Sequence, residues 1–89
     1  MSDIEALLTE LRKLPAIRVS DADDVEALLT GVRTAAGRWA DILYDLQEAS
    51  RGLVGPRAEA ALTVAFRRAE ECYVELEIAL DACARGSRG

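Results

Sequence analysis

An unbroken heptad pattern in the C-terminal half constrains this chain more than any other feature of its sequence. Small and apolar residues recur there in alternating steps of four and three, at Ala58, Leu62, Ala65, Ala69, Cys72, Leu76, Ala79 and Cys83. A 3.5-residue repeat is typical of a helix that packs lengthwise against another helix. We name these positions the C-terminal heptad stripe and expect them to face a partner helix.

A second heptad pattern supplies that partner helix within the same chain. Its members are apolar, recur in steps of three and four, and form what we name the central heptad stripe: Val25, Leu28, Val32, Ala35, Trp39, Ile42, Leu46 and Ala49. Between the two stripes, Gly52 suits the left-handed position just past a helix, and Pro56 suits the first position of the next one. The sequence therefore predicts an antiparallel hairpin of two long helices, over residues 21–50 and 56–85.

Two glycines interrupt the first long helix without shifting its apolar phase. Gly31 and Gly37 each cost a helix about 1 kcal/mol relative to alanine. Because the stripe continues through both, we predict one helix, bent near Gly37, although glycine at such places can also mark close approach of another helix. Trp39 is expected to fill the core at the bend, or alternatively to anchor an interface.

A short amphipathic segment precedes the hairpin. Ser2 followed by Glu5 forms a capping box, and a leucine-rich face follows it at Ile4, Leu7, Leu8 and Leu11. Pro15 is expected to end this helix, which predicts helix over residues 3–13 and an extended linker over 14–19, with Ser20 as the next N-cap. Because so short a helix is unstable alone in water, its leucine face must pack against another element.

The predicted fold is all-α, a single helical domain over residues 1–89 with a frayed tail at 86–89. Its core is rich in alanine, which buries little apolar area, and a chain of this length has little core to spare. We therefore expect a helical bundle that is completed by dimerisation or by a partner.

The last helix carries a second apolar stripe, roughly opposite the first. Ala60, Val64, Val74, Ile78 and Ala82 fall on that side. Apolar residues on two sides of a helix indicate that it is sandwiched, and either the N-terminal helix or a partner chain could cover this stripe. The candidate interface residues are Val64, Val74, Ile78, Trp39, Leu7 and Leu11.

No group of residues in the sequence forms a recognisable chemical site. The chain has no histidine, no phosphate-binding glycine loop and no Cys-x-x-Cys pair. The glutamates between Glu70 and Glu77 are expected to form an ordinary solvated surface, and Cys72 and Cys83 to be small buried hydrophobic residues. We predict no enzymatic activity, no cofactor and no metal.

The charge of the chain limits its partners. The formal net charge is −5, and residues 1–50 carry all of it, which disfavours binding to nucleic acid. No apolar run is long enough to span a membrane, and no signal peptide opens the sequence, so we expect a cytoplasmic protein, with leaderless export still open.

The turn and the residues after it resemble a known family. Leu53-Val54-Gly55 is followed by small residues and Phe66, and the string from Tyr73 to Glu77 matches Tyr-x-x-x-Glu. Over residues 21–85 this is similar to the small Trp-x-Gly helical-hairpin proteins of actinobacterial type VII secretion, although Leu53 stands in place of the tryptophan. The resemblance implies a bacterial, non-enzymatic hairpin that works as a dimer in secretion.

Two functions follow from the residues. The first is a non-catalytic interaction or adaptor protein that binds a second copy or a protein partner through its apolar helix faces. The alternative is a small acidic inhibitor or antitoxin-like protein that occupies a basic site on an enzyme or a nucleic-acid-binding protein, as the charge of residues 1–50 suggests.

Overall fold

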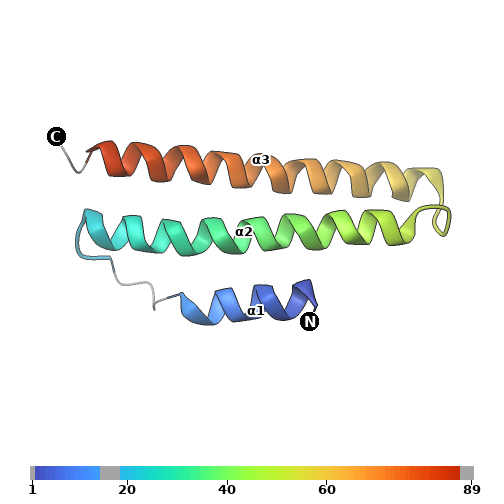
Figure 1. Ribbon diagram of the computed structural model, residues 1–89. Helices are drawn as coiled ribbons and strands as arrows, with labels where there is room; N and C mark the ends of the chain where they lie inside the picture. The colour runs from blue at the N-terminus through green and yellow to red at the C-terminus, as the bar shows by residue number, and fades with distance from the viewer. Residues whose placement is uncertain (1, 15–18, 87–89) are drawn as a thin grey trace.

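The computed structural model describes residues 2–14 and 19–86, and its regular structure there consists of three helices (Figure 1). Helix α1 spans Asp3–Lys13, α2 spans Ala22–Ser50 and α3 spans Pro56–Gly86. The predicted all-α hairpin with a short N-terminal helix is confirmed, and each helix boundary agrees with its prediction to within one residue. The predictions for the linker at 15–18 and the tail at 87–89 lie outside the described residues.

The helices begin at side chains that accept hydrogen bonds from their first turns. The Ser2 hydroxyl accepts from the backbone N–H of Glu5 at 3.2 Å, as expected. The prediction of Ser20 as the cap of α2 was wrong by one residue, because the Asp21 carboxylate accepts from the Asp24 N–H at 2.9 Å. A carboxylate is the stronger acceptor at this end of a helix, where the helix dipole favours negative charge.

The three helices lie side by side in one layer, with α2 in the middle (Figure 1). Within the described residues, α1 and α3 each contact α2 on opposite sides and do not contact each other. The molecule measures 51 × 26 × 17 Å. Its radius of gyration is 15.9 Å, against about 12 Å for a compact domain of this length. The fold is therefore a flat layer with two broad faces.

Three pairs of residues define the seam between α2 and α3. A Cβ atom added at Gly37 would lie 3.2 Å from the ring of Tyr73. The rings of Tyr44 and Phe66 lie 5.4 Å apart, and Gln47 donates a hydrogen bond to the Thr63 hydroxyl at 2.9 Å. All three pairs share one antiparallel register. This seam lies about 150° around α2 from the central heptad stripe, at about 100° per residue.

The central heptad stripe was therefore wrongly predicted to face α3. Trp39 is 49% exposed and Leu46 is 46% exposed, so Trp39 does not fill the core. The C-terminal heptad stripe was half right: Leu62, Ala69, Leu76 and Cys83 are at least partly buried, but Cys72 is exposed instead of buried. Phe66 and Tyr73, which the sequence also places on the main face of this helix, turn towards α2, and Gly37 leaves room for the Tyr73 ring.

Helix α1 packs on the side of α2 that faces away from α3. The Leu14 side chain occupies the space that a Cβ atom would need at Gly31, so both predicted glycine sites mark close approach of another element. At the other end of α1, the Asp3 side chain lies beside that of Asp45 on α2. These contacts make α1 antiparallel to α2. They also exclude the alternative in which the N-terminal helix covers the second stripe of α3.

The layer of helices buries few side chains. Among the described residues only Ala35, Ala40 and Ala69 are buried, and no large side chain is completely buried. The ion pairs found there each join residues three or four apart on one helix, and such exposed pairs contribute little. The isolated chain is therefore held together by half-buried apolar contacts along two seams.

The left-handed backbone conformation of Gly52, in the turn between α2 and α3, can be tested by substitution. Gly52 has φ +79°, a left-handed conformation that costs other residues about 1–2 kcal/mol. We expect Gly52→Ala to lower the free energy of unfolding by about that amount in urea titrations. Gly55→Ala is the matched control, since a Cβ atom meets nothing within 4 Å at either glycine. Equal losses of unfolding free energy in Gly52→Ala and Gly55→Ala would show that the left-handed conformation of Gly52 is not the cause.

Close approach at Gly31 provides a second test. A larger residue must displace Leu14, so Gly31→Val should loosen α1 without weakening α2, because valine has a higher helix propensity than glycine. Hydrogen–deuterium exchange should show faster exchange over residues 3–13 and unchanged protection along the α2–α3 seam. The neighbouring exposed position supplies the control, Thr30→Val. Unchanged protection of α1 in Gly31→Val would count against this packing.

Candidate interaction surface

Contacts between the helices determine which residues each broad face of the layer presents. Helix α2 meets α3 on the side of Gln47 and α1 on the side of Gly31. At about 100° per residue, Asp41 and Glu48 then point to one broad face. The central heptad stripe points to the other broad face, with Trp39 and Leu46 most exposed. One face of α2 is polar and the other is apolar.

The outer helices turn apolar residues to the same side. Because α1 runs antiparallel to α2 and packs through Leu14 and Asp3, its Ile4 and Leu11 point to the side of Trp39. They are 58% and 44% exposed. The apolar residues that α3 turns to this side are all small. We name the whole surface the apolar face: Ile4, Leu7, Leu8 and Leu11 of α1, the central heptad stripe of α2 apart from the buried Ala35, and Ala61, Ala65, Cys72 and Ala79 of α3.

The apolar face has a bulky half and a shallow half. Leucine, isoleucine, valine and tryptophan side chains come from α1 and α2, whereas the side chains from α3 are mainly alanines and one cysteine. The register of Gly37 with Tyr73 places Cys72 at the level of Trp39. Trp39 therefore stands beside a strip of small residues instead of being enclosed by large ones.

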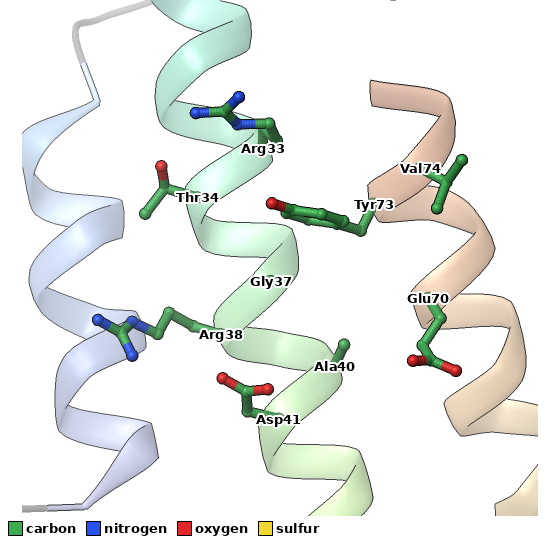
Figure 2. A pocket seen from close by; sticks show the side chains of 9 residues that line it. All are labelled: Arg33, Thr34, Gly37, Arg38, Ala40, Asp41, Glu70, Tyr73 and Val74. Carbon is green, nitrogen blue, oxygen red and sulfur yellow. The ribbon is translucent and has the colours of Figure 1, made fainter. Parts of the chain in front are cut away.

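The opposite, polar face has a groove of about 440 Å³ between α2 and α3. In Figure 2 the Tyr73 ring crosses from α3 towards α2 near Gly37, whereas Arg38 points to α1 and Glu70 lies back along α3. The charged groups of this groove do not converge on a common point.

The glutamates and cysteines do not assemble a metal site in the part of the chain that the structure describes. No group of three or more potential ligands from cysteine, aspartate and glutamate side chains comes together there. In the same residues, no helix has an apolar stretch long enough to cross a membrane.

One carboxylate pair bridges α1 and α2. A hydrogen bond with Asp3 raises the pKa of Asp45, and repulsion from the negative charges of Asp3 and Asp41 raises it further. An acid with a raised pKa in the folded state binds its proton more tightly there than in the unfolded chain. The charged pair therefore weakens the α1–α2 contact at neutral pH, and this effect fades as the pH falls through the pKa of the folded state.

Repulsion between Asp3 and Asp45 predicts that neutralising Asp45 stabilises the fold by an amount that depends on pH. Asp45→Asn should raise the urea midpoint of unfolding at neutral pH, because it removes the repulsion from Asp3 and Asp41. The difference from the unaltered protein should shrink as the pH falls through the raised pKa of Asp45, because the original carboxyl group then gains its proton. A variant that is less stable at neutral pH, or a gain that grows on acidification, would contradict this explanation.

The predicted interface residues divide into two surfaces. Trp39, Leu7 and Leu11 lie on the apolar face. Val64, Val74 and Ile78 are about half exposed on the side of α3 that points away from α2, which we name the outer edge together with Ala60 and Ala82. The structure does not bring these two groups together.

Sequence reasoning missed Ile4, Leu8 and Leu46 as interface residues. All three belong to stripes that the sequence shows clearly, and all three are more than two-fifths exposed. The stripe of Leu46 was predicted to be a contact within the hairpin, and the face of Ile4 and Leu8 was predicted to pack against another element. Their use on an open face depends on how far each helix is rotated, which the pattern alone does not give.

No protein-family model, curated protein or solved structure matches this chain. The resemblance to the Trp-x-Gly hairpin proteins therefore stays a prediction. What the surface does must be argued from its own geometry.

Proposed function

We propose that this protein is a non-catalytic helical interaction protein, which binds another protein through the apolar face. One observation carries the proposal: all three helices turn an apolar stripe to the same broad face, and large side chains there, such as Ile4, Trp39 and Leu46, stay about half exposed. Contiguous apolar surface with a polar rim is typical of protein interaction sites.

The hydrophobic effect gives this face a strong tendency to be covered. Full burial of a large apolar side chain contributes about 1.5–3 kcal/mol, at about 25 cal/mol per Å² of apolar area. Ile4, Leu11, Trp39 and Leu46 are each roughly half exposed, so covering any one of them would contribute about half of that free energy. A partner that covered all four would gain several times as much binding free energy. The polar face offers no comparable gain.

The distribution of charge favours this function over an acidic inhibitor. An inhibitor that occupies a basic site needs a surface of mainly one sign. The polar groove instead combines Arg33 and Arg38 with Asp41 and Glu70. Charges of both signs at this spacing describe an ordinary solvated surface, so the apolar face is the better candidate for binding.

A photo-crosslinking amino acid tests this function in the host cell. Placed at Leu46 on the apolar face, it should give covalent adducts with protein, because a partner covers this position. Placed at Val64 on the outer edge, it serves as the control, since the two residues are 46% and 47% exposed. Adducts of equal yield at both positions, or none at Leu46, would contradict the proposal.

A further inference from the structure

We infer that the occupant of the apolar face is a second copy of this chain, packed face to face around a twofold axis. The inference rests on the proposed function, and it names the partner. Three properties of the molecule support it: the area left exposed, the shape of the apolar face and the distribution of charge.

The exposed area matches what a homodimer needs. The chain exposes 6436 Å², whereas a compact monomer of its mass exposes about 5,100 Å². The difference is about 1,300 Å² per chain, and a standard interface hides about 800 Å² of each partner. Two copies that hide this excess bury about 2,600 Å² in total, which lies in the range of permanent homodimers.

The apolar face is complementary to itself. A twofold axis that runs parallel to the helices over α2 exchanges α1 and α3, so the small residues on α3 of each copy lie opposite the large side chains on α1 of the other, and the two α2 helices meet at the axis. The small residues Ala65, Cys72 and Ala79 then receive large side chains from the partner copy. This pairing gives α3 of each copy a large apolar neighbour that its own chain does not supply.

Charge favours a second copy over a membrane surface. Each chain carries a net charge of −5, which anionic lipid headgroups repel. Within the apolar face itself, the α2 stripe from Val25 to Leu46 contains no charged residue, and Arg68 and Glu75 lie at the rim on α3. Two copies can therefore meet without opposing like charges at the centre.

Light scattering during gel filtration tests the inference on the purified chain. We expect a mass near twice 9.6 kDa that does not change with reductant, because the contact is packing and not a disulfide. Leu46→Glu and Ala79→Arg should each convert the dimer to a monomer, since each places a charge in the face. The matched controls Val64→Glu and Ala82→Arg, on the outer edge, should stay dimeric. Circular dichroism should show that all four variants keep their helices.

A chemical readout covers the case in which the face variants fail to fold. Alkylation of Cys72, followed by mass spectrometry of its peptide, should slow as the concentration of the unaltered protein rises through the range in which it dimerises. The side chain is exposed in the isolated chain and covered in the proposed dimer. A rate that does not depend on concentration would overturn the inference.

The remaining outcomes separate this inference from the proposed function. The purified chain could be a monomer at all concentrations while position 46 forms adducts with a different protein. This result would overturn the inference that the partner is a second copy, and it would leave the proposed interaction function in place. A dimer that Val64→Glu or Ala82→Arg disrupts, while Leu46→Glu does not, places the interface on the outer edge and overturns the inference. A dimer that reductant dissolves also overturns it, because a disulfide then joins the copies.

Discussion

The close approach of α2 to α3 at Gly37 determines what the other surfaces of the protein present. The Tyr73 ring occupies the space beside the glycine, and the buried alanines Ala40 and Ala69 lie on the same seam. At Gly37, Ala40 and Ala69 the backbones approach closely, which leaves little room there for larger side chains of α2. The heavier apolar side chains of α2, with Trp39 foremost, are therefore turned out of the hairpin and onto a broad face.

The position of α1 makes that face larger instead of covering it. Leu14 fits against Gly31 on the far side of α2, so the third helix extends the layer sideways. Its own leucines add to the exposed apolar area. The result is a layer whose two faces differ in chemistry, because the polar residues of α2 and the groove beside Tyr73 lie on the opposite side.

Local signals were sufficient to predict the helices and their ends. Ser2, Gly52 and Pro56 act within a few residues of their own positions, and the structure uses each of them as expected. The cap of α2 was misplaced by one residue because Ser20 and Asp21 are both good N-caps, and only the geometry of the first turn chooses between them.

The rotation of the helices could not be predicted in the same way. Helix α2 carries two interleaved heptads: the central heptad stripe, and a second one that faces α3 and consists of Leu29, Arg33, Ala36, Ala40, Leu43 and Gln47. The first is more apolar, so hydrophobic periodicity favours it as the inner seam. The choice depends on residues of the other helix, such as Thr63, which accepts a hydrogen bond from Gln47 of the second heptad, and Tyr73, which lies beside Gly37. The side on which α1 packs is likewise decided by a contact at Gly31, and no local pattern reports it.

The order of the helices in the layer has a consequence for how the chain folds. Each helix touches only its neighbour in the sequence, so contacts between elements are made across short connections. Proteins with such low contact order fold quickly, typically in microseconds to milliseconds, because little loop entropy is lost before contacts form. The order of the layer therefore favours folding in which each helix packs on the one before it in the sequence.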